Sequence, residues 1–255
     1  MLRSRIIPCL LVHNKGLIKT VQFKDSKYVG DPINAVKIFN EKHVDEIMVL
    51  DIDASVEKRG PNFNMIRDLA IECRMPLCYG GGVTNVDEVR KIIKLGAEKV
   101  AVSSAAINNP SLLSEMSAAV GAQSIVLVLD VAKRGLFTSS YEIFTLNGKH
   151  KTGIKLKDFL KQIKEIPYGE IVINNIDRDG MMNGYDFELI DIVRNATELP
   201  MTALGGAGTL DDLKSLVERY KIIGAAAGSL FVFKGKYKAV LISYPMKEEK
   251  KNILY

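Results

Sequence analysis

The segment Ser124-Ile-Val-Leu-Val-Leu-Asp130 decides the fold, because five apolar residues run without a polar interruption into a single carboxylate. Such a run is typical of a strand buried on both faces, as in a parallel sheet covered by helices. The carboxylate then stands where the strand leaves the core. Asp130 is therefore the first candidate for a functional residue.

A second copy of this pattern opens the chain as Ile6-Ile-Pro-Cys-Leu-Leu-Val12. Aligning the two strands places Leu11 opposite Asp130, so one half keeps the acid and the other lacks it. Three further pairs recur at one common spacing of 124 positions, namely Glu46 and Glu170, Asp53 and Asp177, and Gly81 and Gly205. A spacing shared by several features indicates an internal repeat.

Strand and helix patterns alternate along the whole chain, which is the signature of repeated βα units around a parallel sheet. The eight expected strands lie near 6–12, 46–51, 76–79, 99–102, 125–129, 170–174, 200–204 and 222–227. Four units followed by four similar units favour a closed (βα)8 TIM barrel of the α/β class over an open Rossmann sheet. We expect one domain over residues 1–255, with half-barrels at about 1–122 and 123–245 and a tail at 246–255.

Several connections are also predicted. Residues 13–30 are expected to form a polar loop, and Asn109-Pro110 is expected to start a helix. The Tyr141–Phe144 segment, followed by a turn at Asn147-Gly148, indicates a small β-hairpin inserted after the Asp130 strand. The lysine-rich segment 247–251 reads as a solvated tail.

Composition narrows the function classes. The apolar fraction of 47% and charged fraction of 25% are those of a globular protein. No apolar run approaches the length of a membrane span, and no signal-like segment follows the N-terminus, so we expect a cytoplasmic protein without a membrane partner. The net charge of +5 suits anionic small ligands, and the aromatic residues are not interleaved with basic ones as nucleic-acid binding would require. Three cysteines without metal-type spacing, Cys9, Cys73 and Cys78, predict neither a metal nor another cofactor.

Glycine-rich turns follow two of the expected strands, and in such barrels the carboxyl ends of the strands carry the active site. Each turn lets backbone amides approach a ligand and leads into a helix N-terminus that favours anions. The sequence therefore predicts two phosphate sites on opposite sides of one mouth, although tight βα turns alone would also explain the glycines. The candidate residues are Gly81, Gly82, Ser103 and Ser104 on one side, and Gly205, Gly206, Gly228 and Ser229 on the other.

Asp130 and residue 11 would project between these two sites. A pair of carboxylates there would permit general acid–base catalysis, with one group accepting a proton while the other donates. Leu11 can do neither. A two-carboxylate mechanism then fails unless Asp51, Asp53 or Asp177 substitutes.

Five motifs resemble the cyclase subunit of imidazole glycerol phosphate synthase, a lyase of histidine biosynthesis, namely Arg5-Ile-Ile-Pro-Cys9, Gly80-Gly-Gly82, Asn108-Asn-Pro110, Asp177-Arg-Asp-Gly180 and Gly184-Tyr-Asp186. The resemblance covers essentially the whole chain. It implies a barrel docked on a glutaminase subunit as a heterodimer, with ammonia passing through the barrel to a phosphorylated small-molecule ligand. It also implies an acid–base pair at Leu11 and Asp130, and phosphate contacts from Asp179 and Gly180.

The resemblance further implies roles at both ends of the barrel. The family's charged ring, through which ammonia enters, corresponds to Arg5, Glu46, Lys99 and Glu170, which are all retained. A structural layer of salt bridges is the alternative interpretation of this ring. Lys19 corresponds to the mobile-loop lysine, and Gln123 lies at the expected glutaminase face. The mouth departs from the family pattern at Leu11, Ser103, Asn174, Met181 and Leu204.

This combination resembles an offshoot of the family linked to acetamidino modification of sugars in bacterial surface polysaccharides. The segments Gly16–Thr20, Lys27–Pro32 and Lys238–Pro245 carry that likeness. The leading hypothesis is an ammonia-channelling subunit that works with a glutaminase and a sugar amidotransferase. The alternatives are a working histidine-pathway cyclase and a non-catalytic phosphate-binding scaffold.

Overall fold

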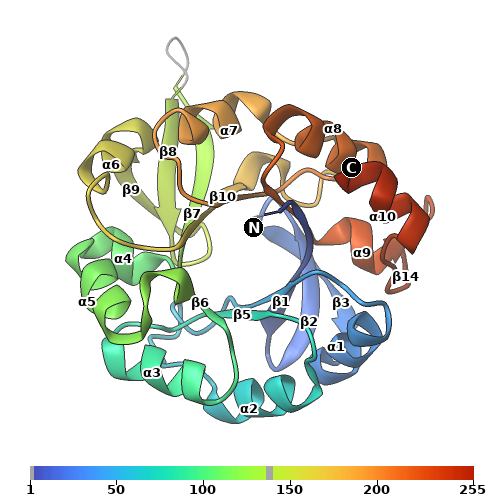
Figure 1. The fold of residues 1–255 in the computed structure, drawn as a ribbon, viewed down its shortest axis with the longest axis horizontal. Coiled ribbons are helices and arrows are strands. Elements are labelled where there is room, and N and C mark those ends of the chain that lie inside the picture. The colour runs from blue at the N-terminus through green and yellow to red at the C-terminus, as the bar shows by residue number, and fades with distance from the viewer. Residues whose placement is uncertain (1–2, 136–139) are drawn as a thin grey trace.

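Eight parallel strands close into a barrel in the computed structural model, which describes residues 3–135 and 140–255 (Figure 1). In barrel order they are β1 (Arg5–His13), β4 (Ile47–Asp51), β5 (Leu77–Gly80), β6 (Lys99–Val102), β7 (Ile125–Arg134), β10 (Glu170–Asn175), β11 (Met201–Leu204) and β12 (Gly224–Ala227). The barrel closes because β12 pairs in parallel with β1, with Arg5 opposite Gly224. The predicted (βα)8 barrel is therefore confirmed.

Helices form an outer ring around these strands (Figure 1). They are α1 (Pro32–Glu41), α2 (Phe63–Glu72), α3 (Val86–Lys94), α4 (Ser104–Asn108), α5 (Ser111–Val120), α6 (Leu156–Gln162), α7 (Phe187–Arg194), α8 (Leu210–Tyr220) and α9 (Ser229–Val232), with 3₁₀ turns η1 (Ala122–Ser124) and η2 (Ile176–Arg178). Asp31 caps α1 and is followed by Pro32 at the first helical position, while Asn85 and Glu88 form a reciprocal capping box on α3. The predicted helix after Asn109-Pro110 is α5, and it is preceded by the short helix α4, which the sequence analysis did not predict.

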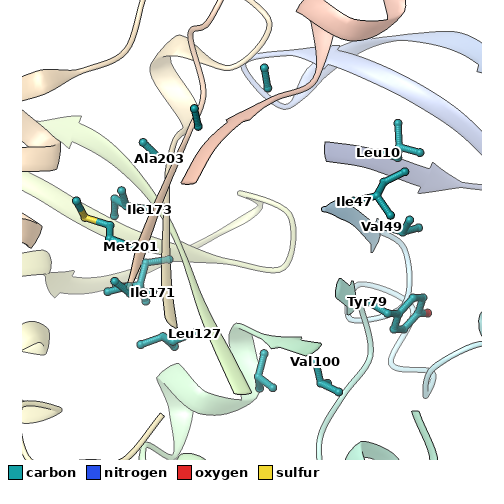
Figure 2. Close-up of a cluster of buried hydrophobic side chains, with 14 of the residues drawn as sticks. Leu10, Ile47, Val49, Tyr79, Val100, Leu127, Ile171, Ile173, Met201 and Ala203 are labelled. Carbon is teal, nitrogen blue, oxygen red and sulfur yellow. The ribbon is translucent and has the colours of Figure 1, made fainter. Parts of the chain in front are cut away.

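Alternate side chains of the strands enter two separate apolar layers. The layer between strands and helices is the larger one, and residues of it are labelled in Figure 2, among them Leu10, Ile47 and Leu127. A smaller cluster fills the barrel interior with Ile7, Cys9, Met48, Cys78, Ala101, Val126, Val128, Val172, Leu204 and Ala226. Cys9 and Cys78 are free, buried thiols in this interior.

The prediction of a polar loop at 13–30 is wrong. The segment forms an antiparallel hairpin, β2 (Gly16–Val21) and β3 (Lys24–Gly30), with β2 paired to the end of β1. Its lysines suggested a solvated loop, but Leu17 to Thr20 are all buried, Lys19 included. β3 is largely exposed, and this mixed pattern concealed the hairpin.

The inserted hairpin is confirmed as β8 (Ser140–Thr145) and β9 (His150–Lys155), and β8 also pairs with the extended end of β7. The prediction of a solvated tail is wrong, because Lys247–Leu254 forms helix α10, which packs on α8 after the short hairpin β13 (Phe233–Lys234) and β14 (Ala239–Val240). Ile253 is buried, and Lys250 pairs with Asp45 at 2.6 Å. The tail is amphipathic over only two turns, too short for a clear helical period.

Candidate functional site

A cavity of about 400 Å³ opens at the carboxyl ends of the barrel strands. Asp130 and Lys19 line it together with all ten residues predicted to bind phosphate. We call Gly81, Gly82, Ser103 and Ser104 the first cradle, and Asp179, Gly180, Gly205, Gly206, Gly228 and Ser229 the second cradle. The first follows β5 and β6 and the second follows β10, β11 and β12, so the two face each other across the mouth.

Two glycines show why each cradle requires this residue. Gly81 has a φ of +123°, and a Cβ atom there would lie 2.4 Å from the carbonyl oxygen of Asp51. Gly206 has a φ of +111°, and its Cβ would lie 2.1 Å from the carbonyl oxygen of Gly184. Both turns thus depend on a residue without a side chain, and both leave their backbone open to the cavity.

Asp130 lies at the centre of the mouth and accepts a hydrogen bond of 2.8 Å from the Asn174 amide nitrogen on the neighbouring strand. Burial raises the pKa of Asp130 to about 6, and the charge of Asp179 acts in the same direction, while the Asn174 hydrogen bond opposes both. A carboxyl with this pKa exchanges a proton near neutral pH. Leu11 and Leu50, which are direct neighbours on β1 and β4, face the same space.

Stability should fall as the pH rises through the range in which Asp130 ionises. Between about pH 4 and 6 the unfolded chain loses this proton while the folded chain keeps it, so ionisation opposes folding. We expect Asp130→Asn to be more stable than the wild type by about 1–3 kcal/mol near pH 7.5 and equal to it near pH 4. Urea unfolding at the two pH values measures this, and an equal difference at both would contradict the assignment.

The hairpin β2–β3 is folded over the mouth and is fixed to the loop after β10, three strands away around the barrel. Thr20 Oγ1 donates to Asp179 Oδ2 at 2.7 Å, and the backbone of Gln22 donates to the Asp179 carbonyl at 2.8 Å. Phe23 packs on the small cluster of Ala132, Phe144 and Ile176. These contacts hold the hairpin closed above the cavity.

Lys19 is carried inward by this hairpin. Its ammonium group donates to the Cys9 carbonyl and lies so close to Gly228 that a Cβ there would meet Nζ at 2.1 Å. Burial lowers the pKa of Lys19, although nearby Asp179 favours its charged form. The predicted substrate-loop lysine therefore stands next to the second cradle.

Thr20→Val should loosen the hairpin, because it leaves the half-buried Asp179 carboxylate without its side-chain donor. A hydrogen bond to a charged group contributes about 1.5–3 kcal/mol, so amide exchange over residues 16–30 should rise by about 10-fold or more. Thr152→Val, which removes a hydrogen bond within the β8–β9 hairpin, is the control. Unchanged exchange at 16–30 in Thr20→Val would show that other contacts hold the hairpin.

The four predicted gate residues meet at the opposite end of the barrel and form a closed ring, which we call the floor ring. Arg5 contacts both Glu46 and Glu170, and Lys99 Nζ bridges the same two carboxylates at 2.9 and 2.7 Å. Burial alone would raise the pKa of Glu170, but Arg5 and Lys99 outweigh it and lower the pKa to about 2. Gln123 lies in the exposed turn η1 on this face.

Several cavity residues were not predicted from the sequence, among them Lys58, Arg59 and Phe23. Lys58 lines the cavity beside the first cradle and makes no ion pair within 3–135 or 140–255. Its neighbour Arg59 is anchored by two hydrogen bonds, of 2.7 and 2.9 Å, to the buried Asp51 carboxylate. Phe23 also lines the cavity. Their signal was a position in segments that follow barrel strands, where ligand contacts concentrate, but none of them is itself a strand-end residue.

The fold and the cavity define a class: a (βα)8 barrel whose strand ends carry two glycine-rich anion sites around a central carboxylate. A profile of the family described as "Histidine biosynthesis protein" matches residues 5–238. The chain belongs to this family, and to the part of it that contains the HisF subunits of imidazole glycerol phosphate synthase. The resemblance to the cyclase family predicted from the motifs is thereby confirmed.

The chain is similar over its full length to provisionally named imidazole glycerol phosphate synthase subunits. It is 54% identical to the one designated hisF3 of Vibrio vulnificus, covering 100% of this chain and 97% of the relative. It is 52% identical to one of Leptospira interrogans, covering 100% of both. The imidazole glycerol phosphate synthase subunit HisF of Dictyoglomus thermophilum is 37% identical, over 98% of this chain and 97% of its own.

Two further properties bear on the kinds of ligand and partner. None of the helices in the described part of the chain has the length and hydropathy needed to span a lipid bilayer. Across residues 3–135 and 140–255, no group of three or more His, Cys, Asp or Glu side chains is arranged to hold a metal ion.

Proposed function

We propose that this chain is the ammonia-channelling subunit of a glutamine amidotransferase system, as a heterodimer with a glutaminase. In this role it supplies ammonia to a separate amidotransferase that forms acetamidino groups on sugars of surface polysaccharides, in the cytoplasm. The observation that carries the proposal is a complete floor ring beneath a mouth in which a leucine replaces one of two central acids. The first feature serves the entry of ammonia and the second impairs the family's ring-closing chemistry.

The barrel interior supports passage of a neutral molecule. Between the floor ring and the mouth it is packed with apolar and thiol side chains such as Ile7, Cys9 and Val128. A charged ammonium ion would lose its hydration there without compensation, whereas neutral ammonia would lose far less. The floor ring would then open by exchange of one cation between two carboxylates that both already contact it.

The residues at the mouth support the proposal that the family's ring-closing chemistry is impaired. Losing one member of a general acid–base pair costs about 10²–10⁴ in rate. Three carboxylates were named above as substitutes for an acid at position 11. Asp51 is bound by Arg59, and Asp53 and Asp177 do not line the cavity. Asp53 pairs with His13, and Asp177 accepts from the Lys133 amide.

The pattern of relatives also supports a distinct branch. The four provisionally named relatives are 46–54% identical to this chain. The four imidazole glycerol phosphate synthase subunits named without qualification are 36–38% identical. If this chain had kept the histidine-pathway role, there would be no reason for its sequence identity to be higher with the provisionally named relatives than with the others.

The test combines the chain with its glutaminase and measures glutamine hydrolysis. Hydrolysis should rise only when the sugar amidotransferase or its substrate is also present. Lys99→Met, which breaks the floor ring, should uncouple hydrolysis from amidine formation, while Lys133→Met on the surface should not. Absence of a complex with the glutaminase in gel filtration would refute the proposal.

One observation favours the alternative of a working cyclase. Asp179 lines the same cavity, its charge raises the pKa of Asp130, and burial raises its own pKa. Asp130 and Asp179 would then form the acid–base pair. Ring closure from the two-phosphate ribulosyl substrate and ammonium salt by the purified chain, lost in Asp130→Asn and increased in Leu11→Asp, would establish this alternative.

A further inference from the structure

One side of the barrel mouth carries three leucines. Leu204 ends β11, Leu11 and Leu50 lie near the carboxyl ends of β1 and β4, and all three line the cavity. Only β12 lies between β11 and β1, and its end contributes Ala227 and Gly228. We call Leu11, Leu50 and Leu204 the leucine wall. It reaches across the mouth from β11 to β4, and polar side chains flank it, with Lys19 beside Gly228 and Asp51 at the end of β4.

The other half of the mouth is polar. Gly80 ends β5, Ser103 directly follows β6, and Asp130 and Asn174 lie in the carboxyl-terminal parts of β7 and β10. All four line the same cavity. Asp130 and Asn174 are joined by their hydrogen bond, so the polar groups of this half lie together. A ligand at the mouth therefore meets hydrogen-bonding groups on one side and hydrocarbon on the other.

The contrast between the two sides of the mouth favours some organic groups of a bound ligand over others. A polyhydroxylated chain between the two cradles would press hydroxyl groups against the leucine wall, where they lose hydrogen bonds to water and gain none. An aromatic or alkyl body would instead remove apolar surface of the wall from water. The leucine wall thus disfavours a ligand whose organic group is a ribulosyl-type chain and favours a ligand whose organic group is apolar.

The leucine wall continues directly into the second cradle. Leu204 is followed by Gly205 and Gly206, and the ammonium group of Lys19 lies against Gly228. A phosphate held in the second cradle would therefore place the group esterified to it along the wall. The first cradle lies across the mouth, next to the polar half.

We propose that the cavity binds a phosphomonoester with an apolar or aromatic body, its phosphate in the second cradle and its body on the leucine wall. The proposal rests on the phosphate role predicted for the two cradles. It adds the chemical class of the organic group, and it makes Leu204, Leu11 and Leu50 the residues that determine this specificity.

The test compares phenyl phosphate with ribose 5-phosphate, which carry the same charged group on bodies of similar size. In calorimetric titrations of the full chain, phenyl phosphate should bind about 10-fold or more tightly, the scale of discrimination by a small apolar pocket. Leu204→Ser should weaken the binding of phenyl phosphate by about 10-fold, and the binding of ribose 5-phosphate should be unchanged or tighter. Leu204→Met, which keeps the wall apolar, should preserve the preference of the wild type.

Equal or tighter binding of ribose 5-phosphate by the wild type would overturn the proposal. So would absence of binding by both esters, or an equal loss for both in Leu204→Ser while the variant keeps its melting temperature. These titrations need neither glutaminase nor sugar enzyme. A failure here therefore leaves the ammonia-channelling assay unaffected, and a failure of that assay leaves the ester preference standing.

Discussion

Glu170→Ala should lower the free energy of unfolding by about 3–5 kcal/mol, the cost of breaking a buried ion pair by removing one partner. Glu170 is 4% exposed and accepts from Arg5, Lys99 and Thr202. Its removal leaves two half-buried cations, Arg5 and Lys99, sharing the single carboxylate of Glu46. Denaturant unfolding near neutral pH measures the loss.

The matched control is Glu188→Ala. Lys133 Nζ lies 2.7 Å from Glu188 Oε2, the same separation as between Lys99 and Glu170, but both side chains are largely exposed. Surface pairs of this kind contribute about 0–1 kcal/mol, so this variant should be nearly as stable as the wild type. Similar losses in both variants would show that the floor ring gains nothing from its burial.

The pH dependence of the same variant gives a second readout. Because the pKa of Glu170 is lowered to about 2 in the folded chain, its stabilising effect is present above its ordinary pKa and is lost as the pH falls towards 2. The difference in free energy of unfolding between the wild type and Glu170→Ala should therefore become smaller below about pH 4. A gap that stays constant with pH would point to lost packing in place of lost charge.

The sequence predicts the barrel and its mouth well because both depend on local signals. A strand buried on both faces must be apolar throughout, as the segment before Asp130 is, and a βα turn with positive φ requires glycine, as at Gly81 and Gly205. Since parallel strands all end at one edge, strand-end residues predicted one by one meet in one cavity. Asp130 and the glycines and serines of both cradles could be assigned in this way, whereas Lys19, Asp179 and Gly180 were implied only by the family resemblance.

The parts that the sequence did not predict depend on contacts between distant segments. The Asn174–Asp130 hydrogen bond follows from the register of β10 against β7, which no local pattern encodes. The hairpin β2–β3 is stabilised by Asp179, more than 150 positions away, so its lysines were misread as a loop. The leucine wall likewise exists only because β11 and β1 are separated by a single strand after the barrel closes.

Gly206→Ala should damage both stability and anion binding. The new Cβ would lie 2.1 Å from the Gly184 carbonyl oxygen, at a φ of +111° that side-chain-bearing residues rarely adopt. The oxygen cannot simply move away, because it accepts a hydrogen bond of 2.9 Å from Arg178, and the Gly184 amide donates to the Gly206 carbonyl at 2.9 Å. Backbone strain and overpacking together should cost about 2–5 kcal/mol.

Gly235→Ala separates the two causes of that loss. Gly235 also has a positive φ, +72°, but no atom lies within 4 Å of its Cβ position, so only the backbone strain, about 1 kcal/mol, should appear. Phenyl phosphate binding, measured where circular dichroism shows each variant folded, should weaken by about 10-fold or more in Gly206→Ala, because the displaced turn no longer presents its amides to the anion. Gly235→Ala should bind as the wild type does. Unaltered affinity in folded Gly206→Ala would mean that the second cradle is a tight turn and not an anion site, and the glycines after β11 would then have a purely structural explanation.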